Sequence, residues 1–277
     1  MSKQSFLPCP RRCDSISATN FNCVVNFMKK IFLLAGTEDG RKLAEFLTSR
    51  NFDVTASVVS DYGRKLLENC AGIKINDKPL DRDELEKILC AGNFDCLVDA
   101  SHPYAQNISA NAIAAAQAVK VAYVRYERAE VAPAYEKIFH VDSYESAADK
   151  AAQLGKNIFL TTGSRSLKIF VDRLKGCNLT ARVLPTAEVL AHCESLGLSP
   201  NQIVAMQGKF SVALNVELFR HAAAEVIVTK NSGQIGGVDT KIAAAELLRL
   251  PVVMIDRPKI FYPNIATTFE DVLKLIG

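Results

Sequence analysis

The chain has 277 residues, 49% of them hydrophobic, with no tryptophan and a formal net charge of +3 at pH 7. This length suits one or two domains, because a single hydrophobic core stops growing at roughly 250–300 residues. The weak net charge, without a basic stripe interleaved with aromatic residues, argues against nucleic acids and membrane surfaces as partners, and no run of about 18 apolar residues is present to span a membrane.

The cysteines and histidines lack the spacing of metal sites. The eight cysteines include no C-x-x-C pair, and the four histidines are separated along the chain. A chain long enough to build its own core does not need disulfides, so we expect reduced thiols, a cytoplasmic protein and no metal. No G-x-S-x-G sequence occurs, which argues against an α/β-hydrolase.

Residues 1–27 contain no hydrophobic period and are interrupted by two prolines and a basic pair. We expect them to form a disordered extension, with the natural start at Met28. A polar, proline-bearing passage over residues 130–136 interrupts the later pattern. We therefore place a domain boundary near Pro133, which gives an N-terminal domain of residues 28–133 and a C-terminal domain of residues 134–277.

Short β-branched runs alternate with amphipathic or alanine-rich segments from Lys30 to the end of the chain. Continuous apolar strands are typical of parallel sheets covered by helices on both faces, so the pattern predicts a doubly wound α/β fold. The predicted strands are Ile31–Ala35, Val54–Val59, Cys96–Asp99, Val121–Arg125, Ile158–Thr161, Leu179–Val183, Ile203–Met206, Val226–Thr229 and Val252–Ile255. The predicted helices are Asp39–Arg50, Gly63–Asn69, Asp81–Leu89, Ala105–Val119, Ser143–Leu154, Thr186–Leu196, Val212–Ala223 and Val238–Arg249.

Ligands of open α/β sheets lie at the carboxyl ends of the strands, so the loops that follow the strands are the candidate sites. The first such loop contains Gly36, Thr37 and Glu38, and Gly40 follows. Glycine permits the close approach of a phosphate, but the full G-x-G-x-x-G pattern is absent. A tight turn and a cofactor loop are therefore equally good interpretations.

The loop after the second strand contains Ser60, Asp61 and Arg64. An acidic residue at this place is typical of proteins that bind the ribose of NAD, whereas a nearby arginine accommodates the additional phosphate of NADP. Asp61 favours the first cofactor and Arg64 favours the second, which leaves both open.

The loop after the strand Cys96–Asp99 reads Ser101-His102-Pro103-Tyr104. A proline near the first turn of a helix is structurally ordinary, and His102 could be a helix-entry residue without any chemistry. Its place at the carboxyl end of a strand favours a functional role.

Two later loops combine the groups that bind anions. One spans residues 161–166 and carries hydroxyl groups, a glycine and an arginine; the other spans residues 229–241 and carries three glycines and two lysines. Backbone N–H groups beside a lysine recur in phosphate and carboxylate sites, so anion binding is favoured over a simple turn. The residues concerned are Thr162, Gly163, Arg165, Lys230, Ser232, Gly233 and Lys241.

Taken in order, four segments resemble the precorrin-6A reductase family of corrinoid biosynthesis, which includes the cobalt-precorrin-6A reductases. They are Ile31-Phe-Leu-Leu-Ala-Gly-Thr-Glu, Val98-Asp-Ala-Ser-His-Pro-Tyr-Ala, Leu160-Thr-Thr-Gly-Ser-Arg and Thr229-Lys-Asn-Ser-Gly-Gln-Ile-Gly-Gly-Val-Asp-Thr-Lys. The resemblance covers essentially residues 28–277. The chain departs from it at Gly208-Lys209-Phe210-Ser211, where members commonly carry Gly-Pro-Phe-Ser.

The resemblance implies two Rossmann-like domains with largely parallel sheets and a cleft between them. It implies an oxidoreductase that passes a hydride from NADPH or NADH to a ring double bond of precorrin-6A or cobalt-precorrin-6A, without a metal or flavin. We expect cofactor binding by Gly36, Thr37, Glu38, Ser60, Asp61, Arg64 and Ser101. His102 or Tyr104 would deliver a proton, and Tyr126 and Phe210 are candidates for apolar walls.

The implied substrate bears many carboxylates, which suit arginine and lysine at loop tips. We expect substrate binding by Arg125, Thr162, Gly163, Arg165, Lys230, Ser232, Gly233 and Lys241. The expected partner is this small tetrapyrrole-derived molecule, and a monomer and a homodimer both remain open. A methyltransferase that uses S-adenosylmethionine and a non-catalytic dinucleotide-binding module are the alternatives, because doubly wound folds host many functions.

Overall fold

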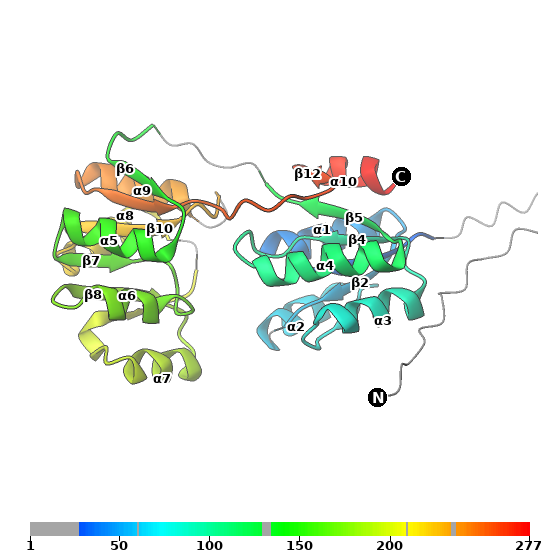
Figure 1. Ribbon diagram of the computed structural model, residues 1–277, viewed down its shortest axis with the longest axis horizontal. Helices are drawn as coiled ribbons and strands as arrows, with labels where there is room; N and C mark the ends of the chain where they lie inside the picture. Colours follow the sequence, from blue (N-terminus) through cyan, green and yellow to red (C-terminus); the bar gives the residue numbers. More distant parts are fainter. Residues whose placement is uncertain (1–27, 60, 129–133, 209, 234–236) are drawn as a thin grey trace, which may run out of the picture. The chain divides into compact units, whose positions relative to one another are not determined.

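The computed structural model describes residues 28–59, 61–128, 134–208, 210–233 and 237–277 (Figure 1). Backbone contacts divide these residues into two compact units. Unit 1 contains the described residues up to Arg128 together with Ile260–Gly277, and unit 2 contains those between them, ending at Lys259. Each unit is a separate α/β domain with its own sheet.

Unit 1 is built on a six-stranded sheet in which every pairing is parallel. The strand order is β3 (Lys74–Asn76), β2 (Asp53–Ser57), β1 (Lys30–Leu34), β4 (Cys96–Asp99), β5 (Ala122–Tyr126) and β12 (Ile265–Ala266). Counted along the chain this is the order 3-2-1-4-5-6 of a Rossmann sheet. The helices are α1 (Glu38–Ser49), α2 (Asp61–Glu68), α3 (Arg82–Gly92), α4 (Gln106–Val119) and α10 (Phe269–Ile276).

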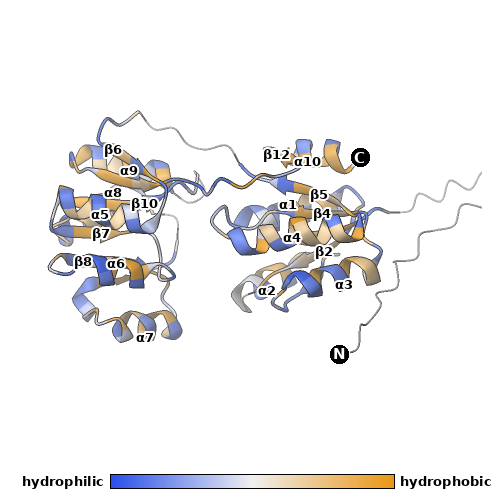
Figure 2. Ribbon diagram, viewed as in Figure 1, coloured by the Kyte–Doolittle hydropathy of each residue, from blue (hydrophilic) through white to orange (hydrophobic). Residues whose placement is uncertain are grey.

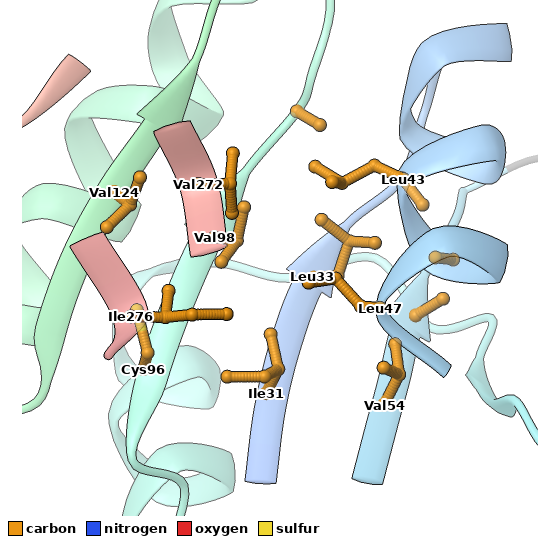
Figure 3. Packing of buried hydrophobic residues seen from close by; sticks show 14 of the residues in the cluster. Ile31, Leu33, Leu43, Leu47, Val54, Cys96, Val98, Val124, Val272 and Ile276 are labelled. Carbon is orange, nitrogen blue, oxygen red and sulfur yellow. The ribbon is translucent and has the colours of Figure 1, made fainter. Parts of the chain in front are cut away.

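Helices cover both faces of this sheet. Ile31 and Leu33 of β1 pack with residues of α1 and α10, such as Leu47 and Val272 (Figure 3). Phe32, which lies between them in β1, packs on the other face with residues of α3 and α4. Successive side chains of a strand point to opposite faces, so a strand that is apolar throughout is buried on both sides.

Unit 2 repeats this arrangement with a second parallel sheet of six strands. The strand order is β9 (Ile203–Ala205), β8 (Asn178–Val183), β7 (Asn157–Leu160), β10 (Val226–Lys230), β11 (Val252–Ile255) and β6 (Ile138–Val141). The elements that connect them are α5 (Tyr144–Leu154), α6 (Leu167–Arg173), α7 (Ala187–Ser195), a 3-10 turn at Pro200–Gln202, α8 (Val212–His221) and α9 (Val238–Leu247). Phe159 and Ile227 pack against α8 and α9, while α5 contacts β10 and β11. In both units apolar residues concentrate on the central strands (Figure 2).

The predicted doubly wound fold is confirmed, since each predicted strand and helix is present with ends shifted by a few residues at most. Three short edge strands, β3, β6 and β12, and the helices α6 and α10 were not predicted. These strands lie at sheet edges and bury few side chains, so they lack the continuous apolar run that marks the central strands. No helix within the described ranges combines the length and apolarity that crossing a membrane requires.

The structure corrects the predicted end of the second domain. Residues 260–277, assigned from sequence to the range 134–277, belong to unit 1. Two backbone bonds hold them on the edge of β5, from Arg125 N to the Asn264 carbonyl at 2.8 Å and from Glu127 N to the Ala266 carbonyl at 2.9 Å. An open edge on β5 accepts this returning strand, which a linear pattern does not reveal. The boundary near Pro133 and the extension 1–27 lie outside the described residues.

Candidate functional site

In each unit, two of the loops singled out from sequence meet at the point where the strand order reverses. In unit 1, β1 and β4 are neighbours, with Leu34 paired to Asp99. In unit 2, β7 and β10 are neighbours, with Leu160 paired to Val228. Open α/β sheets bind their ligands at such switch points, because neighbouring loops diverge there and leave a crevice.

A pocket lies at the switch point of unit 1. It is lined by Thr37, Asp39, Ala100, Ser101, Pro103, Arg125, Tyr126, Glu127 and Arg128. The Thr37 hydroxyl donates to the Ala100 carbonyl at 3.1 Å, which ties the loop after β1 to the loop after β4. Two of the predicted cofactor residues, Thr37 and Ser101, are thereby brought together.

The two glycines of the first loop have different tasks. A side chain at Gly40 would place its Cβ 2.7 Å from the Cα of Ala35, so this glycine allows α1 to pack close to β1. A Cβ at Gly36 would meet nothing within 4 Å, so Gly36 faces open space. Gly36 is therefore the residue of this loop that a ligand can approach.

The start of α1 carries negative charge. Thr37 caps the helix by accepting a hydrogen bond from Gly40 N at 3.0 Å, and Glu38 and Asp39 occupy the first turn. The Asp39 carboxylate is buried and lies 2.6 Å from the Arg128 guanidinium. Burial raises the pKa of Asp39, and Arg128 opposes the shift.

Arg125 lies at the centre of a buried polar network under this pocket. Its side chain is fully buried; Nη1 donates to Asp99 Oδ1 at 2.9 Å and Nε to Glu127 at 3.1 Å. The hydroxyls of Ser109 and Tyr123 donate to the second Asp99 oxygen at 2.6 and 2.9 Å. Arg125 was predicted to bind substrate, but its guanidinium is occupied by two protein carboxylates, so we do not retain that role.

His102 and Tyr104 lie side by side after β4, with ring centroids 5.6 Å apart, and both side chains are partly exposed. His102 Nδ1 accepts a hydrogen bond from Tyr104 N at 3.2 Å, so the neutral ring carries its proton on Nε2. The following helix α4 has no side-chain cap and no acidic residue in its first turn. Its N-terminal N–H groups are therefore not blocked by a capping side chain.

The loop after β2 gives less support to the predicted cofactor residues. Ser60 and the side chain of Asp61 lie outside the described residues. Arg64 is partly exposed and pairs with Glu68 at 2.9 Å and with Asp77 at 3.9 Å.

The switch point of unit 2 gathers the predicted anion-binding residues. Thr162, Ser232 and Lys241 are buried, and Gly163 and Gly233 have positive φ angles of 80° and 75°. Four buried side-chain oxygens around this point have no hydrogen-bond partner among the described residues. They belong to Thr162, Ser166, Thr229 and Asn231. Unpartnered buried oxygens are uncommon in proteins, and here they cluster beside lysines.

Cations dominate the electrostatics of this cluster. Burial, with Arg165 nearby, lowers the pKa of Lys230 to about 8. Burial, together with the positive charges of Arg182 and Lys230, lowers the pKa of Lys241 to about 7, against a weaker opposing effect of Asp239. Like charges held together out of water favour the binding of an anion.

Sequence reasoning missed Arg182 and its buried partner Asn215, whose Oδ1 lies 2.8 Å from Arg182 Nη1. The available signal was an arginine inside the predicted strand Leu179–Val183. Residues 234–236 of the predicted loop lie outside the described part of the chain. Among the described residues, no group of three or more His, Cys, Asp or Glu side chains is arranged to hold a metal ion.

Two parallel sheets with polar switch-point loops define an α/β protein with two Rossmann-like domains. The model of the family "Precorrin-6x reductase CbiJ/CobK" matches residues 30–277. A cobalt-precorrin-6A reductase of Priestia megaterium is 40% identical, with 88% of this chain and 96% of that protein covered. A cobalt-precorrin-6A reductase of Methanocaldococcus jannaschii is 38% identical, with 89% of this chain and 98% of that protein covered.

A solved structure, "CobK precorrin-6A reductase", superposes with a TM-score of 0.74 at 26% identity and covers 89% of this chain and 96% of its own. The chain therefore belongs to the precorrin-6x reductase CbiJ/CobK family, as the resemblance of its loops had indicated.

Replacing Arg125 by methionine is expected to destabilise unit 1, because Asp99 would be left buried without its cation. The expected loss is about 3–5 kcal/mol in the free energy of unfolding. Urea unfolding followed by circular dichroism measures it. The control Arg64→Met removes only exposed ion pairs and should cost at most about 1 kcal/mol. Equal stability of both variants would contradict a structural role for Arg125.

Lys230 and Lys241 should make the stability of unit 2 rise with pH. Their folded pKa values, about 8 and about 7, lie below the ordinary 10.5, so the unfolded chain binds more protons above about pH 7. Above about pH 9, the raised pKa of the buried Cys193 thiol in the same unit acts in the opposite direction.

We therefore expect the melting temperature of the ligand-free chain to increase between about pH 7 and about pH 9. Lys241→Met should flatten this increase, whereas Lys168→Met, which removes an exposed lysine paired with Asp172, should preserve it. A flat wild-type profile would show that folding does not lower the pKa values of these lysines.

Proposed function

We propose that this chain reduces a ring double bond of cobalt-precorrin-6A, or of metal-free precorrin-6A, with a hydride from NADPH or NADH. The observation that carries the proposal is the family match over residues 30–277, which includes both units and every loop at their switch points. Relatives named for the cobalt-containing substrate reach 40 and 38% identity, which favours that form. The family match gives no support to the methyltransferase or the non-catalytic module.

The pocket of unit 1 fits the polar parts of a dinucleotide. Gly36 leaves open space, and Thr37 and Ser101 line the pocket walls with polar side chains. Glu127, which also lines the pocket, is a carboxylate that can accept hydrogen bonds from ribose hydroxyls. Glu38 and Asp39 would repel a pyrophosphate at the start of α1, whereas α4 begins without acid or cap. We therefore expect α4, rather than α1, to receive the phosphates.

The cation cluster of unit 2 fits the acidic side chains of the macrocycle. Lys230 and Lys241, with Arg165 nearby, supply positive charge. Thr162 and Ser232 add side-chain hydroxyls, and Gly163 and Gly233 let the backbone turn toward a ligand. A carboxylate bound here would favour the charged forms of both lysines, which burial disfavours in its absence.

When bound, a reduced nicotinamide supplies the hydride, and a proton must be added to the neighbouring ring carbon to complete the reduction. The chain's task is to orient the two ligands, exclude water and supply that proton. His102 is one candidate, and it would donate from Nε2 in its imidazolium form, which requires Nδ1 to give up the hydrogen bond that it accepts from Tyr104 N. Tyr104, with a hydroxyl on the same loop, is the other candidate.

A direct assay tests the function. We expect purified chain to oxidise reduced dinucleotide only when the macrocycle is present, with cobalt-precorrin-6A turned over faster than precorrin-6A. Loss of the nicotinamide absorbance measures it, with NADPH and NADH tested separately. No oxidation with either macrocycle, by a chain that is folded by circular dichroism, would refute the proposal.

Replacing His102 by glutamine should lower kcat by about 10²–10⁴-fold, because glutamine keeps a polar side chain but does not exchange a proton. The KM values for both substrates should change little. His192→Gln, at an exposed position on α7, is the control and should behave as wild type. A wild-type kcat for His102→Gln together with a large loss in Tyr104→Phe would assign the proton to Tyr104 instead.

A further inference from the structure

Arg182 is a charged residue buried within a strand. It belongs to β8, where the neighbouring residues Ala181 and Val183 are also buried, and Arg182 itself is only 7% exposed. The guanidinium stacks on the ring of Phe210, with 4.0 Å between its Cζ and the ring centroid. Stacking on an aromatic face suits a planar guanidinium better than an ammonium group.

The orientation of this guanidinium is set before any ligand binds. Its Nη1 donates to Asn215 Oδ1 at 2.8 Å, and Asn215 is fully buried. Asn215 is held at its other end, where Nδ2 donates to the carbonyl of Ser211 at 3.0 Å. Phe210 and Asn215 therefore act as positioning residues for Arg182, and such preorganisation lowers the entropic cost of binding.

No carboxylate neutralises Arg182 within the described ranges of the chain, and Asn215 is its only hydrogen-bond partner there. Arg125 of unit 1 is buried even more deeply but has both Asp99 and Glu127 as partners. Burial lowers the pKa of Arg182 to about 10. The charge of Lys241 lies close enough to interact unfavourably with it. A buried charge without a counter-ion is costly, so a fold that retains one usually serves an anion.

From these contacts we infer that Arg182 binds one carboxylate of the macrocyclic substrate, in a subsite that it forms with Lys241. A planar guanidinium with unused N–H groups matches a carboxylate through two parallel hydrogen bonds. The inference rests on the proposed function for the identity of the ligand. A phosphate group of the dinucleotide has related chemistry, and the experiment separates the two.

Steady-state kinetics of Arg182→Met with cobalt-precorrin-6A and reduced dinucleotide test the inference. We expect the KM for the macrocycle to rise by about 10- to 100-fold while the KM for the dinucleotide stays unchanged. Arg182→Lys should recover only part of the loss, since lysine keeps the charge but lacks the planar fork. An unchanged macrocycle KM, or a rise in the dinucleotide KM instead, would overturn the assignment.

The melting temperature distinguishes a role of Arg182 in binding from a role in stabilising the fold. Arg182→Met should leave the melting temperature near that of wild type, because removing an uncompensated charge offsets the lost bond to Asn215. Arg173→Met is the matched control, because Arg173 is exposed and pairs with Asp149 in the same unit. If Arg182→Met does not fold, Phe210→Leu loosens the guanidinium and should raise the macrocycle KM. An unchanged KM in that variant would also overturn the assignment.

Calorimetric titration with benzenehexacarboxylate, a flat ring of carboxylates, tests the subsite without turnover. We expect Arg182→Met to weaken its binding while Arg173→Met does not. A wild-type chain that turns over no macrocycle but binds this probe through Arg182 would refute the proposed function and keep the subsite. Absent binding, or equal affinity in all variants, would refute the subsite.

Discussion

Burial of both sheet faces is the constraint on which the rest of this structure depends. Each central strand packs against helices on either side, as the opposite contacts of Leu33 and Phe32 in β1 show. A polar side chain within such a strand must be fully partnered or it destabilises the fold. Chemistry is therefore confined to the strand ends, and the two switch points collect the hydroxyl groups, cations and open glycines.

Two buried arginines show how the chain meets this constraint in different ways. Arg125 is neutralised within the protein by Asp99 and Glu127, and it stacks on Tyr262. Arg182 has an aromatic platform and an amide but no protein carboxylate among the described residues. The first arrangement stabilises the native state, whereas the second leaves charge that a ligand can neutralise.

The return of the chain to unit 1 couples the two ends of the sequence. Residues 260–277 complete the first sheet with β12 and cover one of its faces with α10. Tyr262 on this segment contacts Arg125, and Asn264 Nδ2 donates to the Tyr123 carbonyl at 2.9 Å. The segment therefore helps to hold the strand from which the buried Asp99–Arg125 network is built.

The sequence by itself determined the doubly wound class and nearly all central strands and helices, and it singled out the loops that are candidate sites. These properties follow from hydrophobic period and from the rule that ligands lie at strand ends, both of which are local in the chain. The family resemblance also came from the ordered loop segments. The sequence could not show that residues 260–277 rejoin the first sheet, because strand pairing depends on which edge is open in space.

The partners of buried charges were likewise decided only by the tertiary structure. Arg125 and Arg182 each follow apolar residues in a predicted strand, and nothing in that pattern distinguishes them. Asp99 lies 26 positions before Arg125 and Asn215 lies 33 positions after Arg182, and only folding brings each pair within hydrogen-bond distance. Whether a buried charge stabilises the fold or awaits a ligand therefore depends on contacts between distant segments.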